Sequence, residues 1–484
     1  MEIEEKKSDI GLIGLAVMGE NLVLNIESKG YRVSVFNRTY SVTENFLATR
    51  ASGKNIAGFN EIKSFIESLE RPRKVMIMVR AGKAVDEVID TIVPLLEKGD
   101  VIIDGGNSNH FDTARRVKYA ESKSLLYVGA GISGGEEGAL KGPSIMPGGS
   151  NGAWFIIKDI FRNIAAKSED GSPCCEWIGG GGSGHFVKMV HNGIEYGDMQ
   201  LISEAYSVMK SMSYMDNESM AQLFDLWNRG KLKSYLIEIT ANILNYKDGK
   251  GDYLIDKILD RAGQKGTGKL SVFNAMELGL PLNLISAAVF ERSLSSEKDL
   301  RVRASQVFKR VPGSFAKPEP QEIHDSLYAS KLVSYAQGFN LLKKASIEFG
   351  WSLNLASIAA IWRNGCIIRS VFLDRISEAY TKSPDLDNML LDKYFADDIK
   401  SSLTAWSSLT AKAAIAGVSI PAFSSALNYF YSISSANLPA NMIQAQRDYF
   451  GAHTFERTDR ERGEFFHENW TGEGGDTSSH TYNV

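Results

Sequence analysis

The sequence predicts an α/β fold, in which an N-terminal Rossmann-type, doubly wound domain precedes a large all-α domain and an extended C-terminal tail. Short apolar runs alternate with helical patterns through the first third of the 484 residues. A Gly-rich run ends this part, and almost everything from Phe186 to about Ala436 then follows a helical pattern. Short buried strands that alternate with helices are typical of a parallel sheet with helices on both faces.

Five strands are expected in the first third, because five short apolar runs there end in turns. A helical pattern over residues 21–28 separates the first two strands, as a βαβ unit requires. The expected strands are residues 10–13, 31–36, 74–79, 101–103 and 125–128.

The Gly-rich run GGGGSG at residues 179–184 separates the part with alternating strands and helices from the part with helices alone. Such a run is most simply a flexible linker. It also leads directly into a strong helical pattern, which fits a domain boundary. We expect the Rossmann-type domain over residues 1–182, the helical domain over 183–435 and the tail over 436–484.

The helical part contains a faint repeat. The segments EAYSVMK and LWNRG, the second with Trp227, recur as QGFNLLK and IWRNG, the second with Trp362. The two tryptophans stand 135 positions apart. Chance similarity between helices is one explanation, and an internal duplication of a helical unit is the other. The final stretch, 471–484, is rich in Gly, Ser and Thr, and we expect it to have no fold of its own.

Composition excludes several classes of protein. With 43% hydrophobic and 23% charged residues, the chain is an ordinary globular protein and not a disordered one. Its 54 Lys and Arg against 58 Asp and Glu give a net charge of −4, which favours neither nucleic acid nor membrane as a partner. No apolar stretch reaches the roughly 18 residues of a membrane-spanning helix. The charged start, MEIEEKKSDI, is unlike a signal peptide.

The three cysteines, Cys174, Cys175 and Cys366, cannot form a disulfide framework. This usage indicates a reducing, cytoplasmic compartment. The few histidines near them make no metal-ligand pattern, so we expect no metal site.

A dinucleotide fingerprint joins the first strand to the first helix. It consists of Gly14, Leu15, Ala16, Val17, Met18 and Gly19, with Ala16 in place of the usual middle glycine. Small residues here let a pyrophosphate approach the backbone at a helix N-terminus. Gly-rich turns between strand and helix are common, so this signal alone is weak.

The end of the second expected strand sharpens the signal. NAD enzymes usually carry Asp or Glu there, to hold the ribose 2′-hydroxyl. This chain has Asn37, Arg38 and Thr39 instead. A carboxylate would repel a 2′-phosphate, whereas Arg38 can pair with it and stack on adenine. The alternative is an exposed arginine in a turn; we favour NADP as the cofactor.

The segment FVKMVHNGIEY, 186–196, is the most informative one. In a helix, Lys188, His191, Asn192 and Glu195 share one face. A solvated polar face is the simple alternative, but His, Asn and Tyr are middling helix formers. Lys188 and Glu195 would lie about 10 Å apart along the axis, so one small substrate could touch both.

Two further Gly-rich segments follow expected strands. They are DGGNS at 104–108 and GISGGEEG at 131–138. Ligands of open α/β sheets bind at such carboxyl ends of strands.

Together, these segments resemble the 6-phosphogluconate dehydrogenase family over nearly the whole chain. The family lies within the wider β-hydroxyacid dehydrogenase superfamily, which shares the first Gly-rich turn and the Gly-rich run before a catalytic lysine. The helix HNGIEYGD and the tail motif RDYFGAH are narrower signals. The motifs that carry the resemblance are GLAVMG (14–19), NRT (37–39), DGGNS (104–108), SGGEEGA (133–139), FVKMVHNGIEYGDMQ (186–200), GQKGTGK (263–269) and QAQRDYFGAHTFER (444–457).

The resemblance implies an oxidoreductase of the pentose phosphate pathway and of gluconate utilization. Its reaction would convert 6-phosphogluconate to ribulose 5-phosphate and CO2 while NADP is reduced. Lys188 corresponds to the general base at the 3-hydroxyl, and Glu195 to the acid that protonates carbon 1 of the enediol. A β-keto acid decarboxylates readily once its carbonyl is polarised, so no metal would be needed. Lys188 must be neutral to act as a base, which requires a lowered pKa.

The family pattern also implies the binding residues and a homodimer with a shared active site. The tail would reach the partner subunit. Cofactor contacts would come from residues 14–19 and 37–39 with Val79, Arg80 and Asn107. The sugar acid would meet Asn107, Ser133, Gly134, Gly135, His191 and Asn192. The substrate phosphate would meet Tyr196, Lys265, Arg292 and Arg447, with His453 close by.

Two departures and two rival functions remain at this point. Family members commonly carry Lys where this chain has Arg80, which is bulkier and planar. Residues 1–9 form an extension without an assigned role. A superfamily enzyme for an unphosphorylated β-hydroxyacid would leave Lys265, Arg292 and Arg447 unexplained. A cofactor-binding regulatory protein without catalysis would leave Lys188 and Glu195 unexplained.

Overall fold

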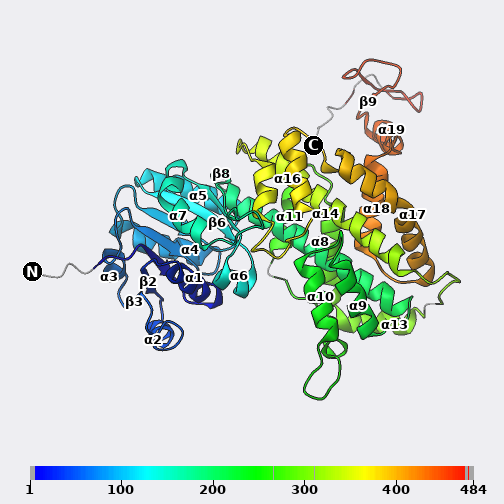
Figure 1. Ribbon diagram of the computed structural model, residues 1–484. Helices are drawn as coiled ribbons and strands as arrows, with labels where there is room; N and C mark the ends of the chain where they lie inside the picture. Colours follow the sequence, from blue (N-terminus) through cyan, green and yellow to red (C-terminus); the bar gives the residue numbers. More distant parts are fainter. Residues whose placement is uncertain (1–5, 265, 310, 475–477, 479–484) are drawn as a thin grey trace, which may run out of the picture. The chain divides into compact units, whose positions relative to one another are not determined.

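The N-terminal part folds around an eight-stranded sheet in the computed structural model, which describes residues 6–264, 266–309, 311–474 and 478. The strand order is β3-β2-β1-β4-β5-β6-β7-β8, and only β6 and β7 pair antiparallel (Figure 1). The strands are β1 Ile10–Ile13, β2 Val33–Phe36, β3 Ile56–Phe59, β4 Lys74–Ile77, β5 Val101–Asp104, β6 Leu126–Ile132, β7 Ile145–Gly149 and β8 Gly179–Gly180. The doubly wound, Rossmann-type order is therefore confirmed.

All five expected strands are present, and three more were not expected. Strand β3 is only half-buried and contains a glycine, so its apolar signal is weak. Strand β7, IMPGG, holds a proline and two glycines, which ordinarily argue against a strand. Because β7 runs antiparallel to β6, the prediction of a wholly parallel sheet is wrong at this edge.

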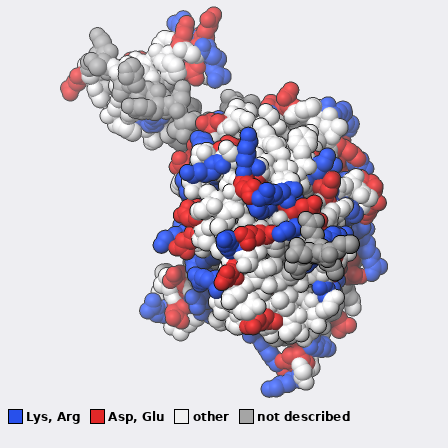
Figure 2. Space-filling model, turned by 90° about the vertical axis from the view of Figure 1, so that its left-hand side faces the viewer, with Lys and Arg blue, Asp and Glu red and all other residues white. Residues whose placement is uncertain are grey.

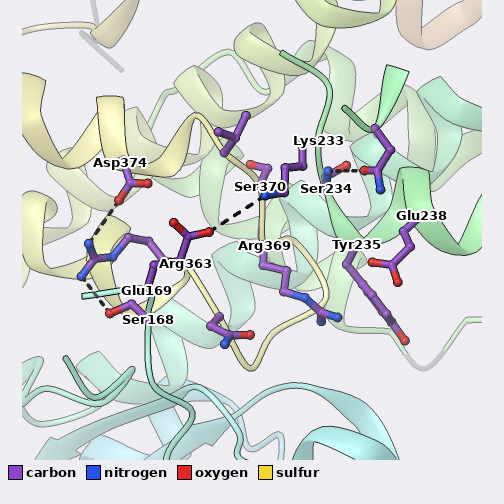
Figure 3. A pocket seen from close by; sticks show the side chains of 13 residues that line it. Ser168, Glu169, Lys233, Ser234, Tyr235, Glu238, Arg363, Arg369, Ser370 and Asp374 are labelled. Carbon is purple, nitrogen blue, oxygen red and sulfur yellow. Dashed lines mark hydrogen bonds and ion pairs between the residues drawn. The ribbon is translucent and has the colours of Figure 1, made fainter. Parts of the chain in front are cut away.

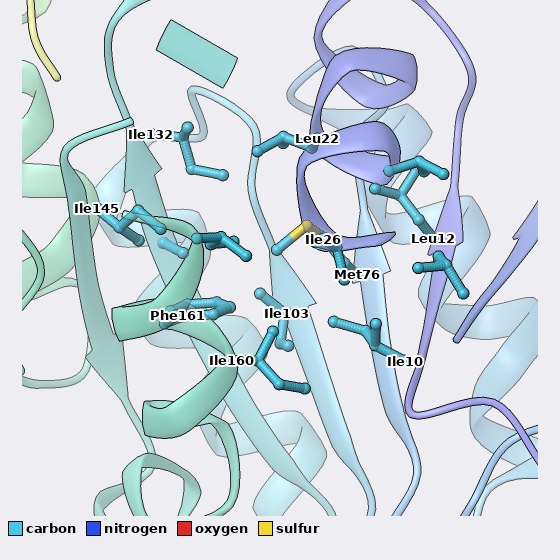
Figure 4. Close-up of a cluster of buried hydrophobic side chains, with 14 of the residues drawn as sticks. Ile10, Leu12, Leu22, Ile26, Met76, Ile103, Ile132, Ile145, Ile160 and Phe161 are labelled. Carbon is cyan, nitrogen blue, oxygen red and sulfur yellow. The ribbon is translucent and has the colours of Figure 1, made fainter. Parts of the chain in front are cut away.

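Helices cover both faces of the sheet. Strand residues alternate between two apolar clusters: Ile10 and Leu12 pack with Leu22 and Phe161, whereas Ile13 belongs to the cluster on the other face (Figure 4). This alternation is the period-two pattern of a strand buried on both sides. The helices are α1 Val17–Ser28, α2 Tyr40–Ala48, α3 Ile62–Glu67, α4 Lys83–Ile92, η1 Val93–Leu95, α5 His110–Ser122, α6 Gly135–Lys141, η2 Asn151–Ala153 and α7 Trp154–Ile164.

The Gly-rich run is not a flexible linker, so that interpretation is wrong. Gly179 and Gly180 pair with Gly148 and Gly149 as strand β8. A Cβ on Gly184 would collide with the carbonyl oxygen of Gly129 on β6. The glycines are there because the next helix crosses the sheet too closely for side chains.

The second part is helical, as predicted, and its helix α8 packs on β6 and β7 and along α14. Both α8 and α14 are 29 residues long. The helices are α8 Ser183–Ser211, α9 Asn217–Trp227, α10 Tyr235–Asn245, η3 Leu254–Lys257, α11 Thr267–Glu277, α12 Asn283–Ser296, α13 Lys298–Val307, α14 Pro320–Glu348, α15 Leu355–Ile361, α16 Leu373–Lys382, η4 Met389–Leu391, α17 Lys393–Ala416 and α18 Pro421–Ile433.

The order of elements supports the duplicated helical unit. The long helix α8 is followed by α9, α10 and η3, and the long helix α14 by α15, α16 and η4. The two units pair where α10 and α16 approach: Tyr235 N donates to Arg369 O at 3.1 Å, and Val371 N donates to Lys233 O at 3.0 Å. These reciprocal bonds join equivalent positions of the two repeated helical segments.

Residues 1–426 form one compact unit and residues 427–484 a second one. The second unit contains the end of α18, helix α19 Ala440–Gly451 and an antiparallel pair, β9 Phe455–Glu456 and β10 Phe465–Phe466. The prediction of a merely extended tail is therefore wrong for these residues. Most of 471–484 lies outside the described residues.

Asp448 organises this second unit. Its carboxylate is fully buried and accepts bonds from Thr454 N at 2.9 Å, Glu468 N at 3.1 Å and Trp470 Nε1 at 2.8 Å. One buried carboxylate with several donors can hold a short segment that has few apolar residues. Hydrophobic periodicity could not reveal this arrangement, because polar contacts create it.

On the surface, charges of both signs are interspersed on the face shown in Figure 2, as the net charge of −4 suggests. Among the described residues, no helix is both long and apolar enough to cross a membrane.

Candidate active site

A cavity of about 730 Å³ lies at the carboxyl ends of β1, β2 and β4, beside the first residue of the dinucleotide fingerprint. The wall includes the predicted residues Gly14, Asn37, Arg38, Thr39, Val79 and Arg80. Arg38 is exposed at the end of β2, where its guanidinium is available to a ligand. The position next to the first βα turn is where this type of sheet binds dinucleotides.

Backbone geometry explains the small residues of the fingerprint. Gly14 has a φ of 105°, and a Cβ there would lie 2.6 Å from the Met78 carbonyl oxygen. A Cβ on Gly19 would collide with the Gly14 carbonyl. Leu15 N donates to Asn37 Oδ1 at 3.1 Å, which ties the turn to the end of β2. Ala16 and Val17 are exposed at the start of α1, and Met18 is half-buried there.

Helix α8 carries the polar face predicted to be catalytic, and that face is buried rather than solvated. Lys188, His191 and Asn192 are 6%, 0% and 7% exposed. Helix α8 can pack this closely against the sheet because β6 has glycine at the contact. A Cβ on Gly131 of β6 would collide with Lys188 Cβ. Glycine therefore serves helix–sheet contact here as well as the nucleotide turn.

The Lys188 amine lies in an environment that favours its neutral form. Burial lowers the pKa of Lys188, while Glu195 and the Cys366 thiol act in the opposite direction. Lys188 Nζ lies 3.3 Å from His191 Nδ1. A lysine that loses its proton more readily can serve as a base near neutral pH.

His191 connects Lys188 to the loop after β6. Its Nε2 lies 3.1 Å from the Ser133 hydroxyl, and its ring meets the Trp362 ring edge-on at 5.6 Å. Burial, with Lys188 beside it, lowers the pKa of His191 well below its usual value. The imidazole is therefore neutral and can position Ser133 without adding charge.

Glu195 lies two turns beyond Lys188 on α8, and its side chain is 22% exposed. Burial raises its pKa, although Lys188 and Arg292 lower it. Its Oε2 lies 3.8 Å from His191 Nδ1. A carboxyl with a raised pKa keeps its proton at higher pH and can act as an acid.

The positive side of the site lies beyond Glu195. The Arg292 guanidinium stacks over the Tyr196 ring at 3.5 Å and lies 3.4 Å from Met199 Sδ. Tyr196 itself is almost fully buried, so the ring fixes the arginine. Lys265 was also predicted here, but it lies outside the described residues.

The remaining predicted residues are distributed over three places. Asn107 is exposed just after β5, and Gly134 and Gly135 begin α6 with φ angles of 109° and 63°. Arg447 and His453 lie in the second unit, at α19 and just after it, and both are half-buried. Within that unit, Arg447 Nη1 donates to Gln444 Oε1 at 3.1 Å.

Sequence reasoning missed the turn at residues 362–370, between α15 and α16. Trp362 packs on His191, and the thiol of Cys366 donates to Trp362 O at 3.1 Å. The Lys188 amine affects the pKa of this thiol, which burial raises to about 12. The repeated Trp motif IWRNG, which includes Trp362, is the sequence signal at this turn.

No group of three or more His, Cys, Asp or Glu side chains that could hold a metal ion occurs in the part of the chain that the structure describes. The described site residues comprise a nucleotide-type cavity, a buried lysine and a carboxyl, which are the groups that a nucleotide-dependent dehydrogenase requires.

Comparison with known proteins gives the family. A model described as the NAD binding domain of 6-phosphogluconate dehydrogenase matches residues 9–179, and one for the C-terminal domain of 6-phosphogluconate dehydrogenase matches residues 184–470. The chain therefore belongs to the 6-phosphogluconate dehydrogenase family.

Relatives are similar over their whole length. The decarboxylating 6-phosphogluconate dehydrogenase of Treponema pallidum is 53% identical, covering 99% of this chain and 100% of its own. The human enzyme of the same name is 52% identical with the same coverage. A Plasmodium falciparum 6-phosphogluconate dehydrogenase, solved in apo form, with its cofactor NADP+ and with its substrate 6-phosphogluconate, is 48% identical; the match has a TM-score of 0.92 and covers 96% of this chain and 100% of that one.

Proposed function

We propose that this protein catalyses the oxidative decarboxylation of 6-phosphogluconate to ribulose 5-phosphate with NADP, as a cytoplasmic enzyme of the pentose phosphate pathway. One observation carries the catalytic roles. A buried lysine with a lowered pKa and a carboxyl with a raised pKa lie on one face of α8. Burial thereby shifts each pKa toward the protonation state that its role requires.

The chain's own residues fit NADP. Gly14 and Gly19 keep side chains away from the turn at the start of α1, so a pyrophosphate can approach the backbone. Arg38 lines the same cavity and supplies a cation for a 2′-phosphate. Arg80, in place of the commoner lysine, keeps the positive charge in that wall. When bound, NADP supplies the acceptor for the hydride.

Lys188 acts first, as a base. Its neutral amine takes the proton of the substrate 3-hydroxyl while the hydride leaves carbon 3. The protonated amine then polarises the new carbonyl and gives its proton to that oxygen as the bond to the carboxylate breaks, so CO2 leaves. Polarisation by an ammonium group removes the need for a metal in this step.

Glu195 acts last, as an acid. Loss of CO2 leaves an enediol. The protonated carboxyl delivers its proton to carbon 1 while the neutral Lys188 amine takes the enol hydroxyl proton, so the carbonyl of the product forms. Burial, which raises the pKa of Glu195, keeps that proton available. The amine and the carboxyl lie 3.3 Å and 3.8 Å from the same atom, His191 Nδ1, and thus serve neighbouring carbons of the substrate.

Substrate recognition would follow the charges. The sugar acid would contact Ser133, Gly134, Gly135, Asn107, His191 and Asn192, and the phosphate would contact Tyr196, Lys265 and Arg292.

We further propose a homodimer in which Arg447 and His453 complete the phosphate site of the partner. Helix α19 supports this, because Met442, Ile443, Tyr449 and Phe450 are 62%, 60%, 60% and 72% exposed. Large exposed apolar side chains in one segment mark an interaction surface.

A turnover assay tests the proposal. Purified protein with NADP and 6-phosphogluconate should form NADPH and release CO2 in equal amounts, and a chelator should not change the rate. Unphosphorylated gluconate is the matched control and should react far more slowly. Equal rates with both substrates would favour an enzyme for unphosphorylated hydroxyacids, and no turnover with either would favour a regulatory protein.

A further inference from the structure

The turn at residues 362–370 is a wall of the candidate site that has no assigned role. Trp362 packs edge-on against His191, and Cys366 is close enough to Lys188 for each group to affect the pKa of the other. The titratable groups that affect Lys188 among the described residues are thus Glu195 on its own helix and Cys366 on this turn, with His191 at 3.3 Å.

The same turn supports the substrate loop at residues 133–135. Gly365 has a φ of 67°, and its carbonyl accepts a bond from Ser144 N at 2.7 Å. A Cβ on Gly134 would lie only 2.6 Å from that carbonyl oxygen. The loop and the turn are therefore in direct backbone contact, and a shift of one moves the other.

Two side chains hold the beginning of the turn, and Asn364 Nδ2 donates to Lys167 O at 2.8 Å. The Arg363 guanidinium donates to Asp374 Oδ1 at 3.1 Å and to Ser168 Oγ at 3.3 Å (Figure 3). It also donates to Asp170 Oδ2 at 3.1 Å. Asp170 and Ser168 follow the sheet helix α7, whereas Asp374 lies in the first turn of α16. Arg363 thus joins the N-terminal part to the helical part at the active-site wall.

The surroundings leave the turn room to move. A cavity of about 350 Å³ lies beside it, lined by Arg363, Arg369 and Ser370 of the turn together with Glu169 and Asp374 (Figure 3). At the other end of the turn, Tyr335 donates its hydroxyl to Ile368 O at 2.6 Å. Without Arg363, the first half of the turn would keep the bonds of Asn364 and Gly365 but lose its ion pairs, so it could shift toward this cavity.

We propose that Arg363 is a positioning residue for the reaction: it clamps the turn at 362–370 so that the substrate loop and Lys188 keep their relative positions. This inference rests on the proposed function. Arg363 acts through Gly365 and Cys366 and does not touch the reacting atoms. A displacement of about 1 Å far from the chemistry can cost on the order of a hundredfold in rate.

The test compares Arg363→Met with Arg363→Lys, Asp170→Asn and a matched control, Arg375→Gln. Arg375 lies on the same helix α16 as Asp374, forms an exposed pair with Glu378 at 2.7 Å and lies 5.3 Å from the centre of the Tyr394 ring. For each variant, kcat, KM for 6-phosphogluconate, NADP affinity, the thermal midpoint and the pH profile of kcat/KM are measured. We expect Arg363→Met to lose at least about tenfold in kcat/KM, Asp170→Asn less, Arg363→Lys to recover part of the loss and Arg375→Gln to match the wild type.

The pH profile separates positioning from mere stability. When the turn relaxes, water reaches Lys188, so burial lowers its pKa less and the acidic limb of the profile moves to higher pH. A purely structural role would reduce the amount of folded enzyme and leave that limb in place. A folded Arg363→Met variant with wild-type kcat/KM and profile would overturn the inference. Absence of turnover in the wild type would instead overturn the proposed function.

Discussion

At the scale of single residues, desolvation is the main cause of the reactivity proposed for α8. It lowers the pKa of Lys188 and raises that of Glu195, so burial moves both groups toward their neutral forms. Their mutual attraction opposes both shifts. A substrate that separates them or carries its own charge would therefore change both protonation states at once.

Replacement of Lys188 with Met tests the base. The variant keeps the length of the side chain but cannot accept a proton, so turnover should fall by about 10² to 10⁴. NADP affinity should stay within several-fold, since the cofactor cavity is lined by other residues. Steady-state kinetics and cofactor titration measure the two quantities. Retention of more than about a tenth of the wild-type rate would remove Lys188 from the role of base.

Replacement of Arg38 with Ala tests the choice of cofactor. Only NADP carries the 2′-phosphate, so NADP should bind far more weakly while NAD changes little. A charge-assisted contact contributes roughly 1.5–3 kcal/mol, which corresponds to about tenfold to over a hundredfold in affinity. Equal losses for both cofactors, measured by titration, would mean that Arg38 supports the turn or stacks on adenine.

The site residues that could be predicted from the sequence are those that belong to short, contiguous sequence motifs. The fingerprint at 14–19 and the spacing of Lys188, His191 and Glu195 are local patterns, and their side chains do come together. Trp362, Arg363 and Cys366 meet the site only through the fold, more than 160 positions after Lys188. No periodicity of the sequence encodes such a contact.

At the scale of elements, close packing of α8 on the sheet depends on glycines in β6. Gly131→Ala would push a methyl group into the Lys188 side chain, whose own Cβ is held by the helix. Overpacking of this kind costs typically about 1–3 kcal/mol and displaces the catalytic amine. We expect a lower thermal midpoint together with a loss of turnover in the fraction that remains folded.

A Gly129→Ala variant is a useful comparison, because a Cβ there would meet Thr113 and His185 instead of Lys188. It should lower the thermal midpoint with less effect on the turnover of the folded fraction.

The glycines also explain which strands could not be predicted from the sequence. Strand propensity is low for Gly and Pro, so β7 and β8 carry no local signal and form because β6 and α8 hold them. Strands with apolar runs, such as β1 and β5, were predictable because propensity and burial agree there.

A second pair of elements is joined by a titratable group. Glu204 of α8 is 2% exposed and accepts bonds from Ala422 N at 2.9 Å and Phe423 N at 3.0 Å, at the first turn of α18. Gln200 donates to the same carboxyl, and Glu291 is the acidic neighbour that repels it. Burial raises the pKa of Glu204 to about 7.

This raised pKa predicts a pH-dependent stability. The protonated form is favoured in the folded state, so its stabilising contribution is present below the ordinary pKa and is lost as pH rises toward about 7. A glutamine side chain at this position does not titrate. The wild type should therefore lose stability relative to the Glu204→Gln variant between about pH 5 and pH 8, by an amount on the order of a few kcal/mol. Denaturant unfolding at both pH values measures it, and a difference that does not change with pH would contradict the assignment.

At the scale of the whole molecule, the chain consists of two compact units, and the residues proposed for the phosphate site are divided between them. Arg292 belongs to residues 1–426, and Arg447 and His453 belong to 427–484. The proposed homodimer brings Arg447 and His453 to the phosphate site of the second copy. The exposed apolar side chains of α19 favour the second copy, since they need a covering surface.

Complementation between two inactive variants tests this arrangement. One subunit carries Lys188→Met and the other Arg447→Ala, and the two are mixed to form heterodimers. If Arg447 acts on the partner's site, one site of the heterodimer carries both defects and the other carries neither, so activity should return to as much as half the wild-type level. If Arg447 acts within its own chain, each site carries one defect and no activity above that of the parents should appear. Homodimers of each parent, carried through the same mixing, supply the baseline. A heterodimer verified by differential tags that stays as inactive as its parents would refute a shared site, because the intact Lys188 and the intact Arg447 would then never meet.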